Sequence, residues 1–192
     1  MKGKRAEMGI GTLILFIAMI LVAAVAAGVL LSTAIGLQSK ALLTGKRTKD
    51  KVATEVQPII IYAKDGSDSN VENFYMHLQL APGSQPIKYA EMLVVMSTKN
   101  DTIEMSWNST ANCSTLPPVG QYAVEEILND SSSSTANYLA RGEVAKLCFQ
   151  YKRSINEDET IVLQLLPKVG NPVILDLTMP SVINKNTVVL YP

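Results

Sequence analysis

Four asparagine triplets give this chain its clearest chemical signal. An Asn-X-Ser/Thr triplet whose middle residue is not proline is the acceptor for N-linked sugars and marks a surface loop of an exported protein. All four lie within thirty residues of polar, loop-like sequence, a denser grouping than chance gives. The acceptor asparagines are Asn100, Asn108, Asn112 and Asn129. We expect Asn112 to be the least favoured, because a disulfide at the neighbouring Cys113 would compete for its loop.

The two cysteines, Cys113 and Cys148, are the second group with chemistry of their own. An even pair in an exported protein suggests one disulfide, whereas in a cytosolic protein it suggests nothing. Sequence alone does not show that the two residues approach each other. The pairing therefore stays open at this point.

Other reactive side chains are sparse. His77 is the only histidine and falls on the polar face of an alternating segment, so we interpret it as a surface residue. The segment 156–159 (NEDE) offers oxygen ligands but lacks calcium-loop spacing, which favours a solvated hairpin turn. Glycine-rich phosphate loops, nucleophile elbows and paired metal-ligand motifs are missing from the sequence. We predict no catalytic residue, no metal site and no cofactor.

A long apolar run precedes all of these residues, and it requires an apolar environment of its own. Residues 8–37 form this run, and no charge occurs between Glu7 and Lys40. A helix over 8–39 would be about 48 Å long, whereas the hydrocarbon core of a bilayer is about 30 Å. It is apolar on every side, so lipid or other protein must enclose it.

Two ordinary explanations of this run remain open from the residues alone. A secretory signal would be cut after small residues, such as the alanine pairs at 23–24 and 26–27. The run is much longer than the usual 7–15-residue signal core, which argues against that reading. A simple membrane anchor would keep the basic cluster of Lys2, Lys4 and Arg5 on the cytoplasmic side.

The letters KRA followed by EMGIGTLILFIAMILVAAVAAGVL resemble the amino terminus of the archaeal flagellins, or archaellins, with their type IV pilin-like helix. The resemblance implies a short basic leader, residues 1–6, removed by a prepilin-type peptidase. Cleavage would fall between Ala6 and Glu7, after Lys4 and Arg5, and would place Gly9 at the third mature position. Ala6 stands where the family more usually has glycine.

The resemblance also implies what residues 7–50 do. They would form an assembly helix that waits in the membrane and then packs with copies of itself in a filament core. Burying each large apolar side chain away from water stabilises the assembly by about 1.5–3 kcal/mol of transfer free energy. The small residues of the helix allow neighbouring helices to approach closely. The large side chains assigned to this contact are Leu13, Phe16, Ile17, Ile20, Leu21 and Val25. Archaellins are commonly glycosylated on the outer domain, so we expect two or more of the four triplets to carry sugar.

The rest of the chain, residues 51–192, predicts a β-sandwich. We expect the helix to fray or kink near Gly45 before short strands begin. Alternating apolar residues and Gly/Pro/Asn turns mark these strands. They are 58–63, 73–80, 89–97, 103–107, 122–128 (strand or helical turn), 144–151, 160–166, 173–178 and 187–190. The fold class is α+β, a long amino-terminal hydrophobic helix followed by an all-β, Ig-like sandwich.

Charge and composition limit the partners. Lys plus Arg equals Asp plus Glu at 17 each, so the chain gives no reason to expect nucleic acid as a partner. Loss of the leader would leave 14 basic against 17 acidic residues.

The resemblance implies a structural subunit of the archaellum filament, which drives swimming. Its expected partners are identical and paralogous subunits, a prepilin-type peptidase, the archaellum motor and assembly complex, and the membrane before assembly. The expected location is the extracellular filament. The alternatives are an adhesive archaeal pilin, a membrane-anchored surface binding domain and, more remotely, a secreted enzyme.

Overall fold

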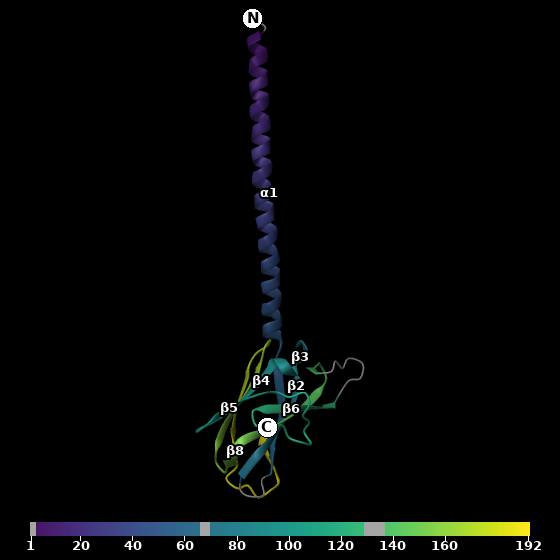
Figure 1. Ribbon diagram of the computed structural model, residues 1–192, viewed down its shortest axis with the longest axis vertical. Helices are drawn as coiled ribbons and strands as arrows, with labels where there is room; N and C mark the ends of the chain where they lie inside the picture. The colour runs from purple at the N-terminus through teal and green to yellow at the C-terminus, as the bar shows by residue number, and fades with distance from the viewer. Residues whose placement is uncertain (1–2, 66–69, 129–136) are drawn as a thin grey trace. The chain divides into compact units, whose positions relative to one another are not determined.

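The computed structural model describes residues 3–65, 70–128 and 137–192, which form two compact units, 1–48 and 49–192. The first unit consists of most of one helix, α1 (Gly3–Ala53). This helix runs without a break (Figure 1). The expected fraying near Gly45 is wrong. A glycine inside a helix costs only about 1 kcal/mol relative to alanine, and leucine, lysine and arginine on either side of it are good helix formers.

The described part of the second unit begins with the last residues of α1 and contains eleven strands and one 3₁₀ turn. They are β1 (Val56–Lys64), β2 (Asn70–Leu80), β3 (Ile87–Lys88), η2 (Tyr89–Glu91), β4 (Met92–Thr98), β5 (Thr102–Trp107), β6 (Gln121–Leu128), β7 (Tyr138–Leu139), β8 (Val144–Asn156), β9 (Thr160–Pro167), β10 (Val173–Thr178) and β11 (Thr187–Tyr191). The segment 122–128 is a strand, not a helical turn. The pair β3 and β7 is an addition that the sequence pattern did not predict.

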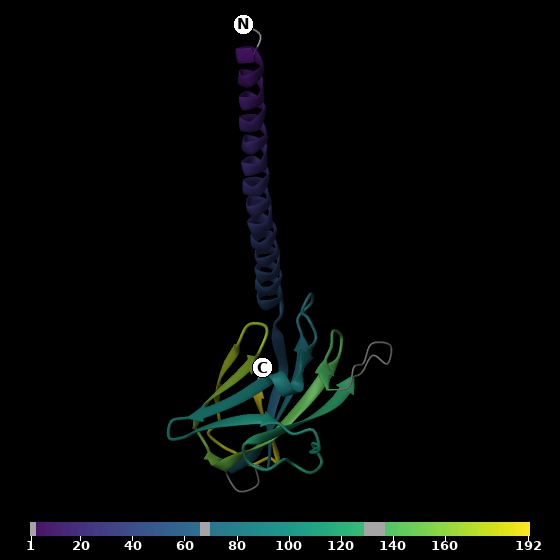
Figure 2. The same cartoon turned by 45° about the horizontal axis from the view of Figure 1, so that its top comes forward.

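Nine of the strands form one sheet in the order β10-β9-β4-β5-β6-β8-β2-β1-β11. Every neighbouring pair is antiparallel except β5 and β6, which run parallel. Inward side chains from both halves of the sheet share a single core, including Val94 and Leu163 from one half and Phe74 and Phe149 from the other. The sheet therefore folds over itself at β5–β6 into the two layers of a sandwich (Figure 2).

The segment Tyr89–Glu91 differs from the expected strand. It forms a 3₁₀ turn, and β4 begins only at Met92. The buried hydroxyl of Tyr122 explains this, because it lies 2.7 Å from the carbonyl oxygen of Tyr89 and 2.8 Å from that of Met92. Two carbonyls that converge on one hydroxyl cannot both point along a strand ladder.

The acidic turn after β8 also differs from expectation. It is not a hairpin, because β8 pairs with β2 and β6 whereas β9 pairs with β4 and β10. The turn carries the chain from one layer to the other. Arg153 forms an ion pair with Glu159 across it, and this pair lowers the pKa of the Glu159 carboxyl.

A closely packed junction follows α1. The backbone N–H of Glu55 donates to Ser84 Oγ at 3.1 Å, and the Gln85 N–H donates to Thr54 Oγ1 at 3.2 Å. The N–H of Asn171 donates to the Thr54 carbonyl at 3.0 Å. Thr54 and Ser84 are fully buried, so these bonds satisfy polar groups that water cannot reach.

Candidate functional site

The surface of α1 is apolar and open to solvent over most of its length. The six side chains assigned to assembly are all exposed, from 49% for Ile17 to 69% for Val25. Leu15, Met19 and Val22, which point in other directions, are at least 70% exposed as well. Apolar side chains therefore surround the helix, and it has no polar face that could be turned toward water while the rest is buried. It is the one helix among the described residues that is long and apolar enough to cross a membrane.

The small residues of α1 leave room for a close neighbour. A Cβ placed on Gly9, Gly11 or Gly28 would meet no atom within 4 Å. These glycines therefore do not serve packing inside the described chain. Small residues at such positions let two helix backbones approach closely, which is how apolar helices associate where hydrophobicity alone gives no preference.

The predicted cleavage region lies within the helical backbone. Lys4, Arg5, Ala6 and Glu7 all belong to α1, which passes through the Ala6–Glu7 bond without a break. The sequence-based boundary at residue 7 therefore has no counterpart in the backbone, and the helix begins four residues earlier.

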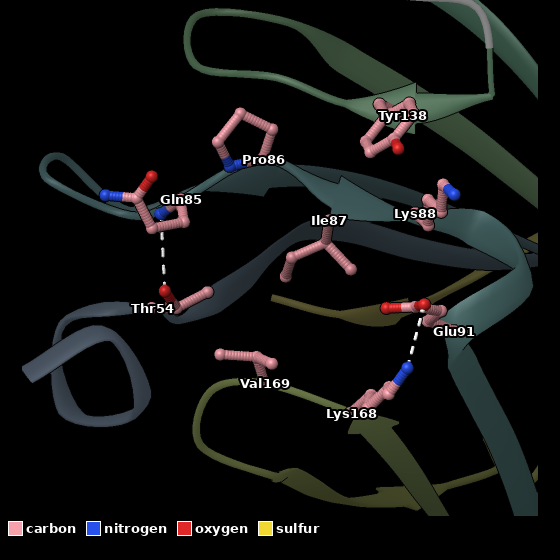
Figure 3. A pocket seen from close by; sticks show the side chains of 9 residues that line it. All are labelled: Thr54, Gln85, Pro86, Ile87, Lys88, Glu91, Tyr138, Lys168 and Val169. Carbon is pink, nitrogen blue, oxygen red and sulfur yellow. Dashed lines mark hydrogen bonds and ion pairs between the residues drawn. The ribbon is translucent and has the colours of Figure 1, made fainter. Parts of the chain in front are cut away.

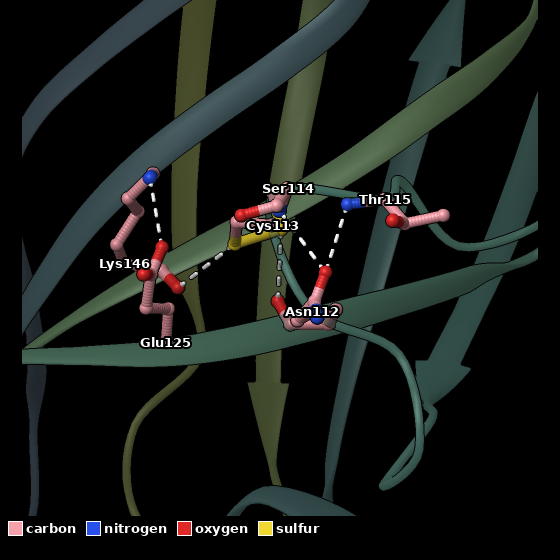
Figure 4. Close-up of a disulfide and its surroundings, with 8 residues drawn as sticks. Asn112, Cys113, Ser114, Thr115, Glu125 and Lys146 are labelled. Atoms are coloured by element: carbon pink, nitrogen blue, oxygen red, sulfur yellow. Dashed lines mark hydrogen bonds and ion pairs between the residues drawn. A yellow bond between two sulfur atoms is a disulfide. The ribbon is translucent and has the colours of Figure 1, made fainter.

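A disulfide joins Cys113 to Cys148, whose Cα atoms are 5.6 Å apart (Figure 4). Cys148 lies on the outward face of β8, and Cys113 lies in the loop between β5 and β6. Ala111 and Leu116 of this loop pack with Cys113 over Tyr75 and Ala123. With a sequence separation of 35 between the cysteines, the bond contributes about 4 kcal/mol to the free energy of unfolding in the chain-entropy description.

The acceptor asparagines of the described glycosylation triplets differ in their exposure to solvent. Asn100 is exposed in the turn between β4 and β5, and Asn112 is exposed beside Cys113. Asn108 is half-buried, and its Nδ2 donates to Gln121 Oε1 at 2.7 Å. That nitrogen is the atom to which a sugar would be attached, so its hydrogen bond would have to break. Asn129 lies outside the described residues.

In the Asn112 triplet, the side-chain oxygen accepts from the N–H groups of Ser114 and Thr115, at 3.2 and 2.8 Å (Figure 4). These bonds use the acceptor oxygen of the amide and fix the loop as an Asx turn.

His77 lies on the outward face of β2, half-buried rather than fully on the surface. Its ring meets Tyr62 edge to face, with centroids 5.7 Å apart, and its buried Nε2 has no hydrogen-bond partner among the described residues. Burial lowers the pKa of this imidazole, and the nearby Lys146 ammonium lowers it further.

The lowered pKa of His77 predicts acid sensitivity. The unfolded chain binds a proton near the ordinary value of 6.5, while the folded chain binds it only at lower pH, so the free energy of unfolding should fall as pH drops below 6.5. We expect His77→Gln to flatten this fall between about pH 6.5 and 5. The measurement is urea unfolding of the full chain in detergent, followed by fluorescence of Trp107, the only tryptophan. Equal pH dependence in both proteins would contradict the assignment.

A shallow cavity of about 160 Å³ lies where the junction meets β3 (Figure 3). Pro86, Ile87 and Val169 give it apolar walls, and Lys168 pairs with Glu91 at 2.9 Å on its rim. No three His, Cys, Asp or Glu side chains come together as a metal site within the described ranges.

An exposed apolar helix followed by a disulfide-bonded β-sandwich is typical of surface proteins whose helix is covered by lipid or by other helices. Comparison with known proteins then gives the family. The sequence matches that of archaeal-type flagellin over residues 6–177. The chain belongs to this family, and its role is that of a structural filament subunit.

Individual relatives can be aligned with nearly the whole sequence of this chain. Flagellin B4 of Pyrococcus abyssi is 31% identical over 217 residues, which span 97% of this chain and 99% of the relative. Flagellin B1 of Methanocaldococcus jannaschii is 29% identical over 210 residues, 99% of this chain and 97% of the relative.

Solved structures share the fold. The archaeal flagellum of Methanospirillum hungatei strain JF1 aligns with a TM-score of 0.70 at 16% identity, over 94% of this chain and 98% of that one. The crystal structure of flagellin FlaB1 from Methanocaldococcus jannaschii aligns with a TM-score of 0.63 at 16% identity, over 72% and 98%.

Proposed function

We propose that this chain polymerises through α1 into the archaellum filament, with the β-sandwich as its outer sheath. The exposed, wholly apolar surface of α1 carries the proposal, because such a surface is stable only when lipid or other helices cover it. Lipid and a helix bundle bury apolar side chains about equally well, so a subunit can move from one to the other at little cost. The role requires no catalytic step and no cofactor.

The route to the filament begins with a membrane-inserted precursor. Lys4 and Arg5 would hold the amino terminus on the cytoplasmic side. Cleavage by a prepilin-type peptidase between Ala6 and Glu7 would remove this positive flank and leave the apolar helix attached. Because α1 is helical there, the peptidase would have to unwind its first turns to reach the bond.

The partners follow from this route. They are identical and paralogous subunits within the filament, the peptidase, and the archaellum motor and assembly complex that would supply force. The mature location would be outside the cell. Balanced charge gives no reason to add nucleic acid.

The decisive experiment is amino-terminal sequencing and intact mass of the protein in sheared extracellular filaments. We expect the mature chain to start at Glu7 with the helix retained. A start after Ala27 would make the helix a signal and contradict the filament role. Protein found only in membranes, still starting at Met1, would favour an anchored surface domain.

We also propose that two or more triplets carry sugar, and that Asn100 and Asn112 are used in preference to Asn108. This order replaces the expectation from sequence that Asn112 is the least favoured acceptor, because the disulfide at Cys113 leaves Asn112 exposed. Asn100 and Asn112 are exposed, whereas Asn108 is half-buried with its Nδ2 hydrogen-bonded.

Removing a used triplet should lower the filament subunit mass by one glycan. We expect this loss for Asn100→Gln and for Asn112→Gln, and a smaller or absent change for Asn108→Gln. Intact mass spectrometry of sheared filaments measures it. Thr102→Ala and Ser114→Ala are matched controls, because they destroy the same triplets and keep both asparagines. A full mass loss in Asn108→Gln alone would reverse the proposed order.

A further inference from the structure

An apolar row crosses the outward face of the β6–β8–β2–β1–β11 layer, where a sandwich ordinarily shows polar residues. The strand registers place five side chains in this row: Val189, Tyr62, Tyr75, Cys148 and Ala123. The rings of Tyr62 and Tyr75 are stacked, with centroids 5.3 Å apart. We call this surface the aromatic face.

Only part of the aromatic face is covered by the chain itself. The loop fastened by Cys113 packs over Tyr75, Cys148 and Ala123. At the other end Val189 remains 55% exposed. Beside the open end, Lys64 Nζ lies 5.9 Å from the centre of the Tyr62 ring and 5.2 Å from that of Tyr75. Lys64 is exposed and forms no ion pair with any residue that the structure describes.

The opposite layer carries a surface of matching character. Leu93, Val162, Leu166 and Ile174 alternate with core residues of β4, β9 and β10 and therefore point outward. Ile174 is 60% exposed. Glu104 of β5 and Asp176 of β10 share this surface, which we call the acidic face.

The acidic face has charge of one sign. Outward positions of β4, β5, β9 and β10 hold no lysine, arginine or histidine. Both carboxylates are exposed, and neither forms an ion pair within the described part of the chain.

We propose that the aromatic face of one subunit docks on the acidic face of the next copy in the filament. Apolar surface would then meet apolar surface, and Lys64 would gain a carboxylate from Glu104 or Asp176. The two faces lie on opposite sides of the sandwich, so each subunit uses both at once. Such a contact is heterologous, the kind of contact that can repeat along a helical polymer instead of pairing off two copies. The inference rests on the proposed filament role and adds a second, sheath-level contact to helix packing.

A zero-length carbodiimide cross-linker tests the contact in intact wild-type filaments. It joins an amine to a carboxylate only where the two touch. We expect a covalent ladder of subunits and a linked peptide pair that contains Lys64 and either Asp176 or Glu104. Lys64 and these carboxylates face away from each other across two layers about 10 Å apart, so a link must join two copies.

Lys64→Arg is the matched control, because it keeps the charge but lacks the primary amine that forms an amide. Its filaments should lose the linked pair to background. Lys64→Glu should lower the temperature at which filaments dissociate, and adding Glu104→Lys and Asp176→Lys should restore it. Unchanged dissociation in Lys64→Glu, or filaments whose Lys64 never links to either carboxylate, overturns the contact alone. If the wild-type chain makes no filaments, the filament role falls and the contact falls with it.

Discussion

Replacing Ile20 by lysine should abolish filaments without preventing membrane insertion. Ile20 lies within the apolar part of α1 and is 52% exposed in the single chain. A lysine near the middle of a membrane helix costs about 2.5–3.5 kcal/mol, which the surrounding apolar residues offset. In a packed helix core an unpaired charge costs about 3–5 kcal/mol, and the cost recurs in every subunit.

The measurement for this variant combines electron microscopy of sheared filaments with fractionation of the cells. We expect cleaved Ile20→Lys protein in the membrane fraction and no filaments outside. Ile20→Leu should assemble like the wild type, because it keeps apolar volume and helix propensity. Normal filaments from the lysine variant would show that this stretch of α1 lies outside the filament core.

Replacing Gly170 by alanine should destabilise the β-sandwich by about 3 kcal/mol or more. Gly170 has φ +123°, a conformation that side-chain-bearing residues rarely adopt. A Cβ there would lie 2.6 Å from the carbonyl oxygen of Thr54, which accepts the N–H of Asn171. The backbone of the junction would have to move and disturb that hydrogen bond.

Gly83→Ala separates the cost of the positive φ from the cost of the close approach to the Thr54 carbonyl. Gly83 also has positive φ, +93°, but a Cβ there would meet nothing within 4 Å. It should therefore lose only the conformational term, about 1–2 kcal/mol. Urea unfolding of the full chain in detergent, followed by Trp107 fluorescence, compares the two. If both substitutions cost the same, the close approach at Thr54 contributes nothing.

Much of the architecture could be read from local pattern. The run of apolar residues after Glu7 predicts α1 because its period and length are properties of neighbouring residues. Phe74, Met76, Leu78 and Leu80 were expected to share one face of a strand, and all four are buried. The family resemblance of the helix was also correct, and the match over residues 6–177 confirms it.

Expectations failed where a distant residue decides local structure. Tyr89 was expected in a strand, but the hydroxyl of Tyr122, 33 residues later, holds it in a turn. The turn at 156–159 looked like a hairpin because hairpins join neighbours in sequence, and only strand order shows that it crosses between layers. His77 was placed on a polar face, yet Tyr62 from β1 half-buries it.

The candidate functional surfaces divide in the same way. The apolar helix, the basic residues before it and the four glycosylation triplets can be recognised from the sequence, because each is a contiguous motif. The folded structure was needed to show that Cys113 meets Cys148 and that Asn108 is less accessible than Asn112. It was also needed to show that Val189, Tyr62 and Tyr75 form one row. These relations depend on strand register and on contacts between residues up to 127 positions apart (Tyr62 and Val189). Burial and pairing of that kind are set by the whole fold, and no local run of residues encodes them.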